Sequence, residues 1–177
     1  MDTSTAGLVG EIKVQRLLNA CKIRFGIKYI SNLPLYCDGT YYQVDDVVVC
    51  TRGFYALEVK NWNCEINCGN QRYWKVKYPT REIVVKSPLA QNTRHCNKIY
   101  TLTGSTPTNI VVFTEGAKLK NPPENVMLLS QFSQFLSSQN EVLTQEQVDT
   151  LANSLAEYKR AIEPQMLLDF IIKRAKI

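Results

Sequence analysis

The chain has 177 residues, 45% hydrophobic and 21% charged, with a formal net charge of +5 at pH 7. These values indicate one globular domain with a substantial core and exclude a disordered chain. No apolar run approaches the roughly 20 residues that span a bilayer, and no signal peptide is recognisable, so we expect no membrane span and a cytoplasmic location with reduced cysteines.

The first expected element is a helix from Thr5 to Cys21, because apolar side chains recur there at helical spacing. Val14, Leu18 and Cys21 lie along its apolar stripe. Glu11 falls inside the same stripe, so its carboxylate either reaches the solvated rim or is directed at the core. A core-directed Glu11 would be an acid available to a site beneath the helix.

Strands are expected after this helix. The first covers residues 25–33 and ends at Pro34. A turn at residues 37–39 leads to two β-rich runs, residues 43–50 and 54–62, and a short turn between the runs predicts a hairpin.

The hairpin carries charges inside apolar runs. Glu58 and Lys60 are two residues apart on one strand and therefore point to the same face. A two-residue turn places Asp45 with them, whereas a three-residue turn places Asp46 there, and two-residue turns are the commoner kind. Facing carboxylates repel unless a cation lies between them, and oxygen ligands suit Mg²⁺ or Mn²⁺. The alternative is a solvated strand edge with no site.

A second, exposed hairpin is expected where residues 65–66 and 73–76 flank Gly69-Asn70. Its basic and aromatic side chains are suited either to contact phosphates and bases or, for the aromatic rings, to pack on the core. The candidate nucleic-acid contacts are Arg72, Trp74, Lys75 and Lys77. Cys64 and Cys68 lie nearby, and no second cysteine pair with metal-binding spacing follows them, so His95-Cys96 is the remaining candidate to complete a zinc site.

A helix is expected over residues 87–102, beginning at a Ser-Pro pair and ending at Gly104. Gln91 and His95 are four residues apart and share one face of it. His95 is the only histidine. We expect a structural role for it, because no serine or cysteine partner for nucleophilic catalysis is evident nearby.

The remainder of the chain predicts two buried strands, at residues 109–114 and 125–129, and then helices. The strand–helix–strand order indicates a parallel pair. The helices are expected at residues 130–136, from a Thr144/Gln147 capping box to about Ile162, and again from Pro164 onward.

Four short blocks, in the right order, resemble the signature blocks of the nuclease-related (NERD) domain, a member of the PD-(D/E)XK nuclease superfamily. They are Gly7-x-x-Gly10-Glu11, Gln43-Val44-Asp45, Glu58-Val59-Lys60-Asn61-Trp62 and Ser87-Pro88-Leu89-Ala90-Gln91-Asn92. The sequence departs from the family at Asp46, where a histidine is frequent, and at Cys64 and Cys68, where glycine is expected.

The resemblance implies an α/β fold with a PD-(D/E)XK nuclease-like core made of a helix, a central mixed sheet with a β-hairpin, a second helix and a strand. C-terminal helices are added to that core. Residues 1–129 would form the nuclease core, and residues 130–177 a helical extension packed on the same domain.

The resemblance also implies metal-dependent hydrolysis of phosphodiester bonds, with Mg²⁺ or Mn²⁺ as cofactor and DNA as the expected substrate. By position, Asp45 and Glu58 would hold the metal, and Lys60 would position the attacking water or stabilise the transition state. Glu11 would support the metal shell, and Gln91 would lie beside the site.

Two other classes of function stay open, because a fold does not fix an activity. In the first, the domain binds nucleic acid but cuts little or not at all, and binding survives Glu58→Ala in EDTA. In the second, the chain is a protein-interaction module whose C-terminal helices form a homodimer face.

Overall fold

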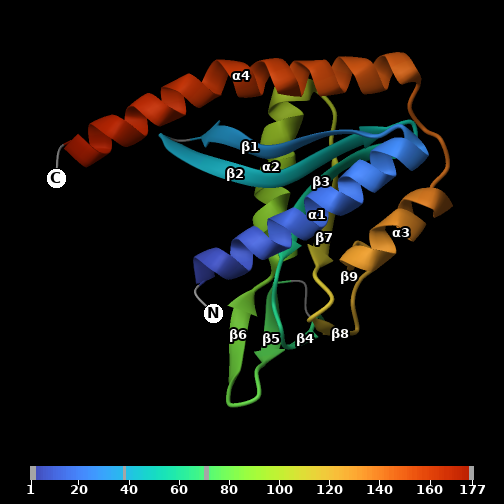
Figure 1. Ribbon diagram of the computed structural model, residues 1–177, viewed down its shortest axis with the longest axis vertical. Helices are drawn as coiled ribbons and strands as arrows, with labels where there is room; N and C mark the ends of the chain where they lie inside the picture. Colours follow the sequence, from blue (N-terminus) through green and yellow to red (C-terminus); the bar gives the residue numbers. More distant parts are fainter. Residues whose placement is uncertain (1–2, 38, 70–71, 176–177) are drawn as a thin grey trace.

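The computed structural model describes residues 3–37, 39–69 and 72–175, which fold into two sheets with helices around them (Figure 1). The helical elements are α1 (Thr3–Phe25), α2 (Pro88–Thr103), the 3-10 turn η1 (Leu129–Gln131), α3 (Phe132–Ser138) and α4 (Gln145–Ala175). None of these described helices has an apolar stretch that could span a bilayer.

The larger sheet is mixed and has five strands in the order β1-β2-β3-β7-β9. Its strands are β1 (Lys28–Cys37), β2 (Thr40–Cys50), β3 (Gly53–Lys60), β7 (Thr108–Phe113) and β9 (Val126–Leu128). The smaller sheet has four strands in the order β6-β5-β4-β8. These are β4 (Glu65–Asn67), β5 (Tyr73–Lys77), β6 (Glu82–Lys86) and β8 (Lys118–Lys120). The expected mixed α/β fold is therefore confirmed.

Helices cover both faces of the larger sheet. On one face α1 crosses the strands obliquely (Figure 1) and packs Leu18 in the same cluster as Leu57 of β3. On the other face, α2 and α4 pack Cys96 and Leu155 in the same cluster as Ala56 of β3. Side chains alternate along a strand, so Glu58 lies on the α2 face.

The turn between β2 and β3 has two residues, because Cys50 pairs with Gly53. Continuing this register from the pair Asp46–Leu57 brings Asp45 to Glu58, so the expectation from turn length is confirmed. The expected parallel pair is also confirmed, since β3 pairs with β7 across the α2 crossover. The second hairpin is present as the antiparallel pair β4–β5, although Asn70 in its loop lies outside the described residues.

Two helix ends follow the sequence signals. Gly104 closes α2 in the left-handed conformation with φ of 70°, as expected for a glycine after a helix. Thr144 and Gln147 form the expected capping box, with hydrogen bonds of 2.8 and 3.2 Å between each side chain and the other's backbone.

Two expectations about the elements are wrong, and one strand was not expected. Strand β1 continues through Pro34, which an edge strand tolerates because it offers one side without ladder hydrogen bonds. Helix α4 also continues through Pro164, where a separate helix was expected. Strand β6, residues 82–86, was not anticipated at all, since it is short and completes a sheet only by pairing with β5.

Candidate active site

Asp45 lies where β2 separates from β3. The β2–β3 pairing ends at Asp46, and Asn32 on the neighbouring strand has a positive φ of 51° between its two paired neighbours. Asparagine adopts this conformation more readily than most residues. The Asp45 carboxylate is held against β3 by the backbone N–H of Val59, which donates to its Oδ2 at 2.7 Å.

Glu58 is the most buried acid of the site, with 2% of its surface exposed. Its Oε1 accepts a hydrogen bond from Nζ of Lys60 on the same strand. Gln91 of α2 also lowers the pKa of Glu58. Within the described part of the chain, Oε2 has no hydrogen-bond partner. A buried carboxylate oxygen without a partner is costly, so a cation or a hydrogen-bond donor at Oε2 would stabilise the site.

His95 is the residue that faces this second oxygen. Its Nδ1 lies 3.7 Å from Oε2 of Glu58, which is too far for a hydrogen bond, and it has no other partner among the described residues. The side chain is buried, and burial lowers the pKa of His95. Two unsatisfied polar atoms therefore face each other across a small gap at the site.

Helix α2 is fixed against the sheet by Asn92, which is fully buried. Its Nδ2 donates to the backbone oxygen of Ala56 and to Oδ1 of Asn109, each at 2.8 Å. Asn92 follows Gln91 and precedes His95 by less than one turn. This anchoring places Gln91 at the exposed rim of the site and His95 in its buried part.

Both acids are shifted toward the protonated form. Burial, and then the negative charge of Glu58, raises the pKa of Asp45 to about 6. Burial also raises the pKa of Glu58, and the positive charge of Lys60 opposes that change. A divalent cation between the two carboxylates would lower both pKa values, because it would favour the charged forms.

The donor set fits a hard cation that keeps several water ligands. Magnesium is commonly held by one or two carboxylates, and here Asp45 and Glu58 provide two with one unsatisfied oxygen. Among the described residues, no group of three or more histidine, cysteine or acidic side chains is arranged to hold a metal. The same finding gives no support to a zinc site at Cys64 and Cys68.

The structure does not bring Glu11 together with these residues. Its side chain is exposed on α1, which packs on the face of the sheet opposite Glu58. Its charge acts on Asp46 instead, whose carboxylate is directed at α1. The helical angle of Glu11 matches the buried stripe, yet its side chain is exposed.

The expectation that Trp74 contacts nucleic acid is wrong. It is fully buried beneath the smaller sheet and lies 6.1 Å from Phe113, centroid to centroid, so it cannot stack on a base. Arg72, Lys75 and Lys77 are exposed, as expected. Side chains alternate along β5, and this period already separates Trp74 from the two lysines.

His95 is the functional candidate that sequence reasoning missed. It was expected to be structural, although its spacing of four from Gln91 placed both residues on one helix face. The packing of α2 on β3 brings the helix face that carries Gln91 and His95 to Glu58, and no local sequence pattern contains that packing.

Residues 6–114 match the nuclease-related domain (NERD) family, and these include the acids, Lys60, Gln91 and His95. No curated protein and no solved structure matches the chain. The match covers more than half of the chain and agrees with the mixed α/β architecture. The chain therefore belongs to the nuclease-related domain family, within the PD-(D/E)XK-like nuclease group.

Proposed function

We propose that this protein is a divalent-metal-dependent nuclease that hydrolyses phosphodiester bonds, with DNA as the expected substrate. The observation that carries the proposal is the buried Glu58 carboxylate, with Lys60 on one oxygen, nothing on the other among the described residues, and Asp45 beside it. Such an arrangement is costly for a fold and is typical of a site that binds a cation.

The proposal assigns a task to each side chain. Asp45 and Glu58 hold Mg²⁺ or Mn²⁺, which polarises the phosphate and lowers the pKa of a bound water when present. Lys60 stabilises the negative charge that develops on the phosphate oxygens. Gln91, at the exposed rim of the site, stabilises the charged form of Glu58, whose pKa it lowers.

The domain organisation belongs to the same proposal. Residues 1–129 form the nuclease core, and residues 130–177 extend it with helices. The first part of α4 packs on the larger sheet, where Val148 and Leu155 join the cluster of Leu33 and Leu35. Lys159 of α4 also donates to the backbone oxygen of Ser31 at 2.7 Å.

A second candidate is a domain that binds nucleic acid with little or no cleavage. Two observations favour it. Among the described residues no third acidic, histidine or cysteine side chain completes a metal-binding group, and Lys60 already neutralises Glu58. In this case the charges around Glu58 would be retained without catalysis.

Cleavage of labelled DNA and RNA panels in Mg²⁺, Mn²⁺ or EDTA tests the proposal. We expect metal-dependent cutting by the wild type and a loss in Glu58→Ala and Lys60→Ala. The matched control is Glu157→Ala, which removes an exposed carboxylate from α4. Equal cutting by all four proteins would remove the proposed site, and binding without any cutting would favour the second candidate.

A further inference from the structure

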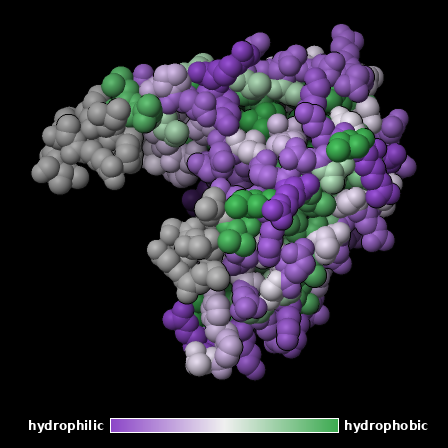
Figure 2. Space-filling model, in the orientation of Figure 1, coloured by the Kyte–Doolittle hydropathy of each residue, from purple (hydrophilic) through white to green (hydrophobic). Residues whose placement is uncertain are grey.

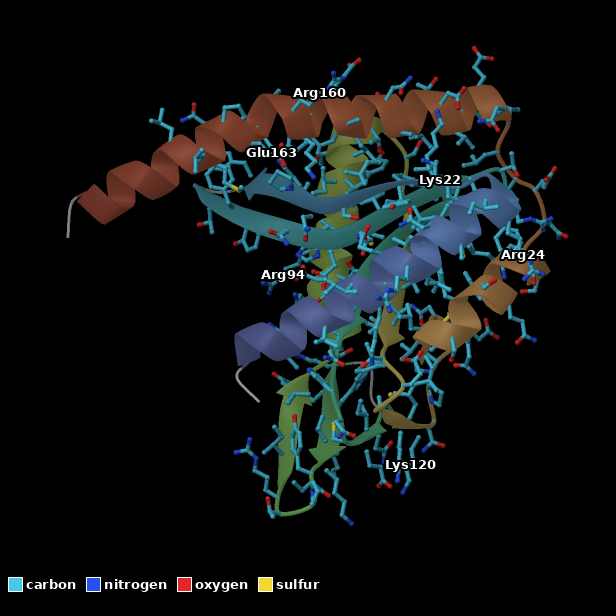
Figure 3. All side chains as sticks on the ribbon, in the orientation of Figure 1. Lys22, Arg24, Arg94, Lys120, Arg160 and Glu163 are labelled. Atoms are coloured by element: carbon cyan, nitrogen blue, oxygen red, sulfur yellow. The ribbon has the colours of Figure 1, made fainter. Side chains whose placement is uncertain are left out.

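The smaller sheet has one covered face and one open face. Trp74, Val76 and Ile66 are fully buried on the covered face, where Phe113 of the larger sheet packs against them. The open face carries the alternate residues of all four strands, and most of these are exposed. In Figures 1, 2 and 3 this sheet extends below the body of the molecule, and Lys120 in Figure 3 lies on its edge strand β8.

Charge is unevenly distributed over the open face. Strand pairing sets Lys77 between two acids, Glu82 on β6 and Glu65 on β4. Glu65 also pairs with Lys120 at 2.8 Å, and these lysines lower the pKa of Glu65. The end of the sheet around Glu82, Lys77 and Glu65 is therefore largely self-compensated.

Two lysines at the other end of the face, Lys75 and Lys86, have no such acidic neighbour among the described residues. Pairing sets Lys75 between Val84 and Asn67, and it sets Lys86 opposite Tyr73. Neither lysine forms an ion pair with any acid in the part of the chain that the structure describes. We call Arg72, Tyr73, Lys75 and Lys86 the basic end. Val84 and Tyr73 are 63% and 48% exposed beside these charges, so the face offers apolar as well as cationic contacts.

The basic end leads directly into α2, the helix that also carries Gln91 and His95. Lys86 is followed at once by Ser87 and α2. The backbone N–H of Ser87 donates to the oxygen of Arg72 at 3.0 Å, which ties the two strands together at this point. Arg72 also lines a cavity of about 390 Å³ with Leu89, Ala90 and Thr93 of α2.

We propose that the basic end is a docking surface for the phosphate backbone of a nucleic acid, holding a substrate whose scissile bond lies at Glu58. The choice of partner rests on the proposed function and on charge complementarity. Uncompensated lysines beside an exposed aromatic ring are suited to a polyanion that also has stackable bases. Lysines at the compensated end already face carboxylates and would release fewer counterions on binding.

The test compares two double variants that remove equal charge from the same sheet face. One is Lys75→Gln with Lys86→Gln at the basic end, and the control is Lys77→Gln with Lys118→Gln at the compensated end. Binding of labelled single-stranded and duplex DNA and RNA is measured in EDTA over a range of salt concentrations. We expect the first variant to lower the salt slope of log affinity by about two and the control by less than about one.

Equal losses in both variants, or no change in the first, would overturn the docking surface. Preferential binding of the wild type to phosphatidylserine vesicles, with no affinity for any nucleic acid, would overturn it as well. Fluorescence of Trp74, which lies beneath this sheet, confirms that both variants fold. If the Lys75/Lys86 variant loses nucleic-acid affinity but Glu58→Ala cleaves at the wild-type rate, only the proposed chemistry fails. If cleavage needs Glu58 and the first variant binds normally, only the docking surface fails.

Discussion

Asp45 and Asp46 are neighbours in the sequence, yet they lie on opposite faces of the larger sheet. Asp45 lies on the α2 face beside Glu58 and Lys60. Asp46 is 3% exposed on the α1 face and accepts hydrogen bonds from the Ser31 hydroxyl and the Gln15 amide. Burial is the main cause of a raised pKa in both, with values of about 6 and about 7.

The difference between them is the kind of neighbour. Neutral donors satisfy Asp46 without requiring a further partner, which is typical of a structural buried carboxyl. Asp45 lies near a second carboxylate, and that repulsion is relieved by a cation or by protonation. Nearby carboxylates raise both pKa values, but only Asp45 also has the Lys60 ammonium group acting on it, so burial and nearby acids alone do not mark a site. The following predictions separate the two faces.

The largest effect is expected from Glu58→Gln, which keeps the shape of the side chain and removes its charge. Cleavage should fall by at least about a hundredfold, because a charged group at the reacting phosphate is lost. The free energy of unfolding should not decrease, because burial disfavours the charge that the substitution removes. Initial cleavage rates and urea denaturation measure the two effects, and a rate within about threefold of wild type contradicts the assignment.

Lys60→Ala should lower cleavage by about a hundredfold, since its ammonium group is the only cation bonded to Glu58 among the described residues. The pKa of Glu58 would rise further in this variant, because Lys60 lowers it in the wild type. Lys22→Ala on the exposed surface of α1 is the control. Similar rates for both variants would exclude a role for Lys60 in the chemistry.

Gln91→Ala should have a smaller effect, about tenfold, because Gln91 favours the charged form of Glu58 without itself carrying charge. Gln91→Glu should be more damaging, since it adds a like charge beside Glu58. The matched control is Asn97→Ala, an exposed amide on the same helix. Steady-state kinetics would contradict the role if Gln91→Ala and Asn97→Ala were indistinguishable.

Asp46→Asn should leave cleavage nearly unchanged and alter the pH dependence of stability. The folded pKa of Asp46, about 7, lies above its ordinary value of 3.8, so the folded state binds this proton more tightly than the unfolded state. Stability should therefore fall as the pH rises from about 4 to about 7, by up to about 4 kcal/mol from this group. Urea denaturation across this range should show a shallower decline in Asp46→Asn, and an identical decline would contradict the shift.

Much of the fold could be predicted from the sequence because its signals are local. The two-residue turn at Thr51-Arg52 sets the register, and the register alone selects Asp45 over Asp46 for the face of Glu58. Alternation along β5 likewise places Trp74 on the face opposite Lys75, so the sequence itself argues against Trp74 as a nucleic-acid contact.

The rest depends on tertiary placement, which no local pattern contains. The sequence predicts the helical angle of Glu11, but whether its side chain is buried depends on how α1 packs on the sheet, and it is exposed. His95 reaches Glu58 only because Asn92 fixes α2 against β3 and β7. Strand β6 exists only through its pairing with β5, so its own five residues gave too weak a signal.

The central claim is tested most directly by comparing Asp45→Asn with Asp46→Asn in one experiment at pH 8. Asparagine can still accept the hydrogen bond from Val59 at one position and those from Ser31 and Gln15 at the other. Manganese affinity and the rate of DNA cleavage are measured for both. The account predicts loss of both properties, by at least about a hundredfold, in Asp45→Asn and wild-type behaviour within about threefold in Asp46→Asn. Equal losses, or a loss confined to Asp46→Asn, would contradict it.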